Sequence, residues 1–452
     1  MYSYEYTEIN VAGKTYQSSR IRQPLRLKIM EHKRVLRLAH RPTVFAHDQA
    51  TTNVFEEFII PVLTRRRITL EESSVRAFRI LVLSVFVAMM GLGIISPIIP
   101  NYASDLGATG VMIGLIYSSF SLSRAILQAP IGRLSDSYSK KKIIIIGLVG
   151  YTVTSVLYTF VTSPETLILV RLLHGVGSAM VMPVAMAYAI ELTPEGQEGK
   201  YMGYLSTALF SGFGAGPLLG GYIYENYSTA LVFNAMSVLV SISLVLTILF
   251  VPDERTLGAR RERPKVSFWK ILTHKKLSGV FVYRAVNALG RGTIMGFLPL
   301  FAVQTLGISG TAVGIILSVG IFIHAFLQTP MGVIADRYDR KRLLIWGGLI
   351  SSLGYFYMIR IGSTAELFAA RLIVSAGSAL SLPAVTAIIA EEGKELGAGS
   401  TVGVFNTAMS VGQIVGPVFT GFLLDNYGMG TVFNFAGAVG IVSVAAFYLM
   451  SR

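Results

Sequence analysis

Seven basic or polar side chains lie inside long apolar stretches of this sequence, where they could bind a substrate or carry a proton. A charge buried among apolar residues is costly, so it usually faces a cavity or a partner. The deep parts of the same stretches contain no Asp or Glu. The set therefore favours a site for neutral or anionic amphipathic molecules rather than for cations. Its members are Arg124, Arg171, His174, Asn287, Arg291, His324 and Arg371.

Histidine changes its charge readily near neutral pH, so His174 and His324 are the candidates for carrying a proton. The alternative for each is a packed or hydrogen-bonded histidine with a structural role. Arg171 and His174 are three residues apart and share one face of a helix. Arg124 is equally compatible with a structural and a functional role. Further candidates for lining a cavity are Met89, Met90, Met180, Met182, Tyr188, Phe210, Phe213 and Met295, each of which could also be a core residue.

The composition places these side chains in a membrane protein. Of the 452 residues, 52% are hydrophobic and 14% are charged, and the mean hydropathy is +0.59. A soluble domain has about 25% charged residues. The absence of cysteine excludes disulfides, thiolate catalysis and cysteine-ligated metal. Because the sequence also has no phosphate-binding loop, metal-ligand cluster or nucleophile triad, it predicts neither an enzyme nor a bound cofactor or metal.

Twelve apolar segments are long enough to span a bilayer, for which a helix needs about 20 residues. Backbone polar groups find no water in lipid, so each segment is expected to be helical. The predicted fold class is an all-α integral membrane protein with twelve transmembrane helices. The spans lie at 78–100, 109–131, 143–162, 166–189, 200–223, 229–251, 277–303, 309–331, 343–361, 365–389, 400–422 and 430–450.

Basic residues gather in the loops on one side of these spans, at 133–142, 255–276 and 337–342. The positive-inside rule places these loops, and with them both termini, in the cytoplasm of a multi-pass plasma-membrane protein. The net charge of +14 is thereby explained without a nucleic-acid partner. The opposite loops, at 101–108, 161–165, 223–228, 304–308 and 423–429, contain no Lys or Arg.

The chain repeats itself at a shift of 200 residues. Asp136 returns as Asp336, Arg171 as Arg371, and Glu191 as Glu391. With six spans each, the two copies have the same orientation, which makes this a parallel repeat about an axis along the membrane normal. The predicted organisation is an N-terminal extension (1–77), a six-helix bundle (78–251), a linker (252–276) and a second six-helix bundle (277–452).

The extension, 1–77, is Arg-rich between Lys14 and Arg41 and fits neither copy. One interpretation is a solvated or partly helical cytoplasmic tail. The other is a contact with anionic lipids, which attract basic segments next to a membrane.

The loop after the second span of each copy combines a glycine, an acidic residue and a basic cluster. A glycine allows a tight turn at a helix end, and a carboxylate there can face the positive N-terminus of a neighbouring helix. Glu191 and Glu391 are the predicted partners of the two basic clusters. The loop residues are Gly132, Asp136, Lys140 and Lys141 in the first copy and Gly332, Asp336, Arg337, Arg340 and Lys341 in the second.

A glycine-proline pattern occupies the fifth and eleventh spans. Small residues allow membrane helices to approach closely, and proline removes a helical hydrogen bond. We therefore expect kinked helices in close contact with their neighbours. The pattern consists of Gly203, Gly212, Gly216, Pro217, Gly220 and Gly221 in the fifth span and Gly412, Gly416 and Pro417 in the eleventh.

The two patterns resemble the signature loop and the antiporter motif of the major facilitator superfamily. The first span, with Gly91-Leu-Gly93 followed by Pro97 and Pro100, is similar to that of its twelve-helix drug:proton antiporters. This resemblance implies two pseudo-symmetric six-helix bundles around a cavity lined by spans one, four, seven and ten. It also implies a latch from Asp136 to the start of the eleventh span and a link between Arg171 and proton coupling.

The sequence therefore predicts a secondary transporter that exports small amphipathic compounds in exchange for protons. One alternative is a uniporter or symporter for an organic anion or metabolite. The other is a membrane sensor or scaffold that does not transport. The expected partners are a small-molecule substrate and the lipid bilayer, and the expected functional unit is a monomer.

Overall fold

The computed structural model describes residues 5–11, 14–20, 60–194, 197–253, 268–396 and 398–451. The first half of the chain forms α3 (Ile60–Ile94), α4 (Ile99–Asp105), α5 (Gly110–Ser137), α6 (Lys140–Leu157), η2 (Tyr158–Phe160), α7 (Pro164–Leu192), α8 (Glu198–Asn226) and α9 (Thr229–Phe250). The second half forms α10 (Phe268–Leu272), α11 (Lys275–Leu300), η4 (Phe301–Thr305), α12 (Gly310–Arg337), α13 (Arg340–Tyr357), η5 (Met358–Arg360), α14 (Thr364–Leu396), α15 (Ala398–Tyr427) and α16 (Met429–Met450).

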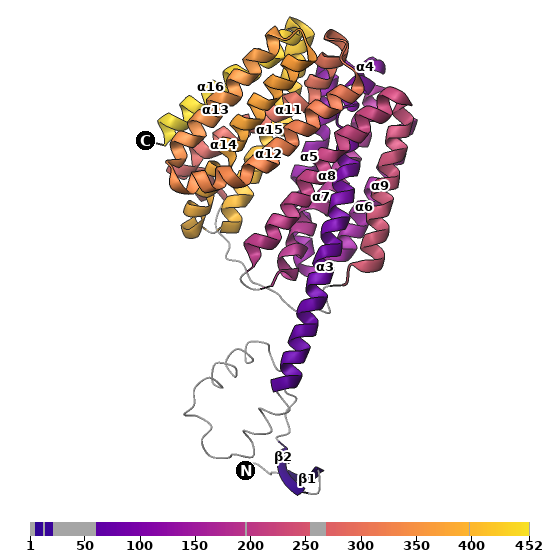
Figure 1. Ribbon diagram of the computed structural model, residues 1–452, viewed down its shortest axis with the longest axis vertical. Coiled ribbons are helices and arrows are strands. Elements are labelled where there is room, and N and C mark those ends of the chain that lie inside the picture. Colours follow the sequence, from indigo (N-terminus) through magenta and orange to yellow (C-terminus); the bar gives the residue numbers. More distant parts are fainter. Residues whose placement is uncertain are drawn as a thin grey trace. The chain divides into compact units, whose positions relative to one another are not determined.

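The prediction of an all-α membrane fold is confirmed. Eleven of the described helical segments have the length and hydropathy of a membrane span. The twelfth predicted span is α8, which lies at the same place in its half as α15 in the other. Figure 1 shows the two bundles of long helices. The first span begins earlier than its apolar run, since α3 is helical from Ile60. It ends at Ile94, and α4 follows with Pro100 in its first turn.

The hairpin of β1 (Glu5–Val11) and β2 (Lys14–Arg20), in which Glu5 is opposite Arg20, was not predicted. It belongs to a separate unit, Met1–Thr69. The predicted lipid contact of the extension falls largely on residues outside the described ones.

The second span of each half begins with the same combination of a positive-φ glycine and a helix N-cap. Gly107 and Gly307 have positive φ angles of 85° and 63°, a conformation that glycine adopts without strain. Two residues later, Thr109 accepts a hydrogen bond from the backbone of Met112, and Ser309 accepts one from Ala312. These N-caps satisfy amide groups that would otherwise lack partners at the helix start. The 200-residue repeat therefore extends to the turns.

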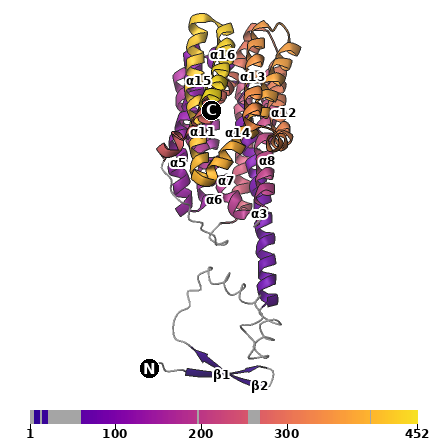
Figure 2. The same cartoon turned by 90° about the vertical axis from the view of Figure 1, so that its left-hand side faces the viewer.

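The two halves contact each other through α5 with α15 and through α8 with α12. Figure 2 shows these two pairs on opposite edges of the molecule. Glycines allow the approach, because a methyl group on Gly114 would collide with the carbonyl of Pro417, and one on Gly314 with that of Pro217. The glycine-proline helices therefore hold the halves together at symmetric positions.

We call the end with the loops 138–139 and 338–339 the basic end and the opposite end the far end. At the far end, Asp425 accepts hydrogen bonds from the backbone of Gly110 (2.5 Å) and Val111 (2.9 Å). Glu225 accepts one from the backbone of Thr311 (2.9 Å). Each carboxylate thus caps a helix of the other half, where the helix dipole also favours a negative charge. Figure 1 shows the bundles diverging toward the basic end.

Replacing both carboxylates, Glu225→Ala with Asp425→Ala, should weaken closure of the far end by about tenfold or more, since each lost cap costs about 0.5–2 kcal/mol. The chain has no cysteine, so a Met295→Cys background reports opening through labelling by an impermeant maleimide added at the far side. Asn226→Ala with Asn426→Ala is the matched control, because these amides bond within their own helices. Equal labelling of both double variants would refute a closing role for the caps.

Candidate functional site

A cavity of about 100 Å³ lies where α8 of the first half meets the second half. Its walls are apolar and aromatic, with a few polar groups among them. Seven of the residues predicted to bind substrate or line a cavity do line it: Phe210, Phe213, Asn287, Arg291, Met295, His324 and Arg371. The other predicted lining residues, Met89, Met90, Met180, Met182 and Tyr188, do not. The complete lining is Phe210, Phe213, Asn287, Arg291, Ile294, Met295, Gly320, Ile321, His324, Tyr355, Arg371, Val374, Ser375 and Ser378.

Two arginines and one histidine, Arg291, Arg371 and His324, face this cavity, and none of the described lining residues is acidic. Arg291 donates a hydrogen bond through Nη2 to Asn287 Oδ1 (3.3 Å). Arg371 donates through Nη1 to Ser375 Oγ (2.8 Å), while its Nε has no partner. The Nε2 atom of half-buried His324 is itself buried and also has no partner. The site therefore combines two guanidinium groups with unused hydrogen-bonding capacity.

The repeat explains why Arg371 reaches the cavity and Arg171 does not. Arg171 stacks against Phe120, with its guanidinium carbon 4.6 Å from the ring centroid, and its Nε donates to the carbonyl of Ile116 (3.2 Å). The residue equivalent to Phe120 in the second half is Gly320. A methyl group there would collide with the guanidinium of Arg371. Phe120 thus covers one arginine, while Gly320 leaves space for the other.

His174 lies in the core of the first half. Its Nδ1 is 2.9 Å from the hydroxyl of Tyr158, and the rings of Tyr151 and Phe120 contact it edge to face. Its side chain is fully buried, and neither His174 nor Arg171 lines the cavity. The predicted role of these two residues in a substrate or proton pathway stays a prediction. Such a pathway would have to run outside this cavity.

Two more arginines lie within the spans but outside the cavity. Arg124 donates to Gln413 Oε1 (3.3 Å), a bond that joins α5 to α15 across the two halves. Arg284 stacks 4.6 Å from the ring centroid of Phe405, and its Nη2 lies 2.8 Å from the sulfur of Met409. Arg124 therefore links the halves, and Arg284 is a buried cation held by polarisable groups.

Sequence reasoning missed Gly320, Tyr355 and Ser375 as cavity residues. Gly320 could have been found by comparing equivalent positions of the repeat, because it is the counterpart of the bulky Phe120. Tyr355 and Ser375 carry no such signal.

The predicted loop glycine turns are wrong. Gly132 lies inside α5 and Gly332 inside α12, and a methyl group on either would have open space. The helices continue because each connection needs only two residues before the next helix, which Ser139 and Asp339 cap. The side chain of Asp136 is not among the described ones, so the latch stays a prediction. Asp336 and Arg337 are exposed.

The expected pairs between carboxylates and basic clusters are present within each half. Lys140 lies 3.0 Å from Glu191, and Arg340 lies 2.6 Å from Glu391. Lys141 instead donates to the carbonyl of Ile248 (2.8 Å), and Lys341 donates to that of Ser451. Each of these contacts connects two helices of the same half at the basic end.

The close packing expected of the glycine-proline spans is observed at most positions. A methyl group would collide with backbone at Gly212, Gly220, Gly221 and Gly412, and it would come within 2.5–2.7 Å of neighbours at Gly216 and Gly416. Gly203 is an exception, with nothing within 4 Å. Pro217 and Pro417 lie within unbroken helices and contact the opposite half through their carbonyl groups.

A sequence profile described as Major Facilitator Superfamily matches residues 81–286 and again residues 280–452, once for each half. The chain belongs to the major facilitator superfamily. This transporter is therefore a multi-pass integral membrane protein. It is 30% identical over 373 residues to an uncharacterized MFS-type transporter of Methanocaldococcus jannaschii, covering 81% of this chain and 96% of the relative.

Other similar relatives of this chain are named for multidrug resistance. It is 27% identical to Multidrug resistance protein 1 of Bacillus subtilis, over 76% of this chain and 89% of the relative. Among solved structures, it resembles an inward-facing, occupied bacterial homolog of the human lysosomal transporter Spinster. That similarity has a TM-score of 0.73 at 16% identity and covers 83% of this chain and 96% of the other. It shows the shared fold.

Proposed function

We propose that this transporter exports small amphipathic molecules, neutral or anionic, by alternating access and in exchange for protons. The observation that carries the proposal is the cavity with Arg291, Arg371 and His324 and no described acidic residue. Buried cations are unfavourable without a partner. An anionic group, or a strong hydrogen-bond acceptor on a neutral molecule, would supply that partner.

The contacts between the halves support alternating access. The cavity lies where the halves meet, and the carboxylate caps close the far end above it. In the orientation that the basic loops predict, the basic end faces the cytoplasm. The described conformation is then the one that receives substrate from the cytoplasm. Both termini would be cytoplasmic, and the membrane would be the plasma membrane.

The apolar part of the cavity supports a broad substrate range. Phe210, Phe213 and Met295 offer surfaces that adapt to different shapes, methionine above all. The relative from Bacillus subtilis is named for multidrug resistance, which accords with this range. We propose no chemical conversion of the substrate and no resident cofactor. The proposed partners are the substrate and the bilayer, with a single chain as the functional unit.

An organic-anion uniporter or symporter is the second candidate, because the same cation cluster would serve it. Reconstitution into proteoliposomes with an internal pH indicator separates the two mechanisms. Antiport predicts that substrate counterflow persists without a proton gradient. It also predicts that net substrate entry drives protons out of the vesicles, so that the internal pH rises. Intact counterflow without any pH change would overturn the antiport proposal.

Within this proposal, His324 is the residue expected to couple protons, since it is the histidine among the described lining residues and histidine ordinarily titrates near neutral pH. His324→Gln should leave counterflow within about threefold of the parent protein but remove the substrate-driven pH change. His174→Gln is the control, because it removes the other histidine within the spans without altering the cavity lining. A pH change that survives in His324→Gln and is lost in His174→Gln would transfer the coupling role to His174.

A further inference from the structure

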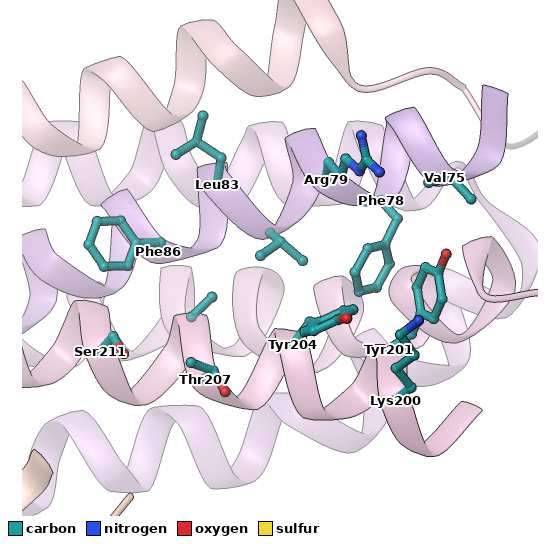
Figure 3. Close-up of a pocket in the computed structure, with 12 residues that line it drawn as sticks. Val75, Phe78, Arg79, Leu83, Phe86, Lys200, Tyr201, Tyr204, Thr207 and Ser211 are labelled. Carbon is teal, nitrogen blue, oxygen red and sulfur yellow. The ribbon is translucent and has the colours of Figure 1, made fainter. Parts of the chain in front are cut away.

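A second groove, of about 540 Å³, lies between α3 and α8 near the basic end. It belongs to the first half alone and shares no lining residue with the central cavity. Figure 3 shows Arg79 and Lys200 toward one end of it and Phe86 and Ser211 toward the other. The lining is Val75, Phe78, Arg79, Val82, Leu83, Phe86, Lys200, Tyr201, Tyr204, Thr207, Ala208 and Ser211.

The groove exists because α3 and α8 pack closely from Phe86 toward the far end but not toward the basic end. From Phe86 onward the helices touch, since a methyl group on Gly212 would collide with the carbonyl of Phe86. Toward the basic end, Gly203 has nothing within 4 Å and large rings lie between the helices. Phe78 and Tyr201 pack edge to face with their centroids 4.7 Å apart, and Tyr204 lies 6.0 Å from Tyr201. These rings hold the helices apart and form an aromatic wall.

The groove has two chemically different ends. Arg79 and Lys200 are exposed cations at one end, and no described lining residue is acidic. Along the remainder, Leu83 and Tyr204 are 49% and 51% exposed, an apolar surface that the described residues leave uncovered. Phosphate is a strong acceptor for guanidinium and ammonium groups, and the apolar wall needs cover from hydrocarbon.

We propose that this groove binds an anionic phospholipid, with its phosphate between Arg79 and Lys200 and an acyl chain along Leu83 and Phe86. Phe86 lies seven residues after Arg79, about 10 Å along the helix, enough to hold part of a chain beside the headgroup. In the orientation given by the basic loops, the cations lie in the cytoplasmic leaflet, which carries the anionic lipids. The groove shares no residue with the proposed substrate site, so either proposal can fail alone.

The test is native mass spectrometry of the purified full chain, titrated with phosphatidylglycerol or phosphatidylcholine of identical acyl chains. Phosphatidylglycerol should bind preferentially. Arg79→Gln and Lys200→Gln should each weaken its binding about fivefold, and together about 25-fold, the attraction of one basic residue per substitution. Arg76→Gln is the matched control, because Arg76 is an exposed cation on α3 that does not line the groove. Equal losses with Arg76→Gln would reduce the effect to general surface charge and overturn the proposal.

A second variant tests insertion of the chain apart from attraction of the headgroup. Thr207→Trp fills the apolar part while keeping both cations, and it should reduce phosphatidylglycerol binding at least tenfold. Undiminished binding in Thr207→Trp would overturn the acyl-chain site. Binding of glycerol phosphate as tight as that of phosphatidylglycerol would also overturn it, since it would identify a site for the anion alone.

Discussion

Arg371→Gln is expected to weaken binding and transport of an anionic amphipathic substrate by about thirtyfold or more. Breaking a buried charge pair from one side costs about 2–5 kcal/mol, and 1.4 kcal/mol corresponds to a factor of ten. Gln keeps a donor that can reach Ser375, which limits the change to the loss of the charge. Thermal-shift titration and proteoliposome transport measure the two effects.

Arg171→Gln is the matched control for this experiment. It replaces the same residue type at the equivalent repeat position, but Arg171 stacks against Phe120 and does not line the cavity. It should alter thermal stability more than substrate affinity. A milder companion is Gly320→Ala, whose methyl group would displace the guanidinium of Arg371 and should lower affinity in the same direction. An Arg171→Gln variant that loses as much affinity as Arg371→Gln would refute the assignment of Arg371 to the site.

Gly114→Ala is expected to reduce transport at least tenfold by preventing closure of the far end. The added methyl group would overlap the carbonyl of Pro417, so α5 and α15 could not approach as they do in this conformation. Binding from the basic side should weaken accordingly. The impermeant maleimide should label Met295→Cys from the far side more strongly in the Gly114→Ala background.

Gly150→Ala provides the control for this substitution. It makes the same change inside a membrane helix, but the nearest atom to the added methyl group, Gly177 Cα, lies at an ordinary 3.8 Å. Both substitutions increase helix propensity equally, so they differ in the packing contact alone. Transport by Gly114→Ala at the level of Gly150→Ala would contradict the closing role of the α5–α15 contact.

The fold could be predicted because its determinants are long-range averages along the chain. Twelve apolar runs and a 200-residue repeat are visible without any knowledge of packing. Helix ends were harder to predict, because α3 continues through polar residues before its apolar run and α5 continues through Gly132. Neither glycine nor polarity ends a helix whose backbone bonds and caps favour continuation.

The sequence predicts which kinds of side chain form the site but not which individual residues line it. The sequence identifies which charges lie within spans, but lipid-facing and core faces are both apolar, so it does not show how each helix is rotated. Arg171 and Arg371 are therefore equivalent candidates until Phe120 and Gly320 are seen beside them. The far-end caps were missed for a simpler reason. Glu225 and Asp425 occupy equivalent positions but are different residues, so a search for identical pairs passes over them.

The central claim is that the cavity selects against cations. The most direct measurement is binding of the purified protein to three fluorescent amphipathic compounds that share one scaffold and carry a carboxylate, a neutral amide or a quaternary ammonium group. The cluster of Arg291, Arg371 and His324 predicts that the carboxylate binds most tightly, the amide less tightly and the ammonium at least tenfold more weakly than the carboxylate. Binding of the ammonium compound as tight as that of the carboxylate would contradict the account.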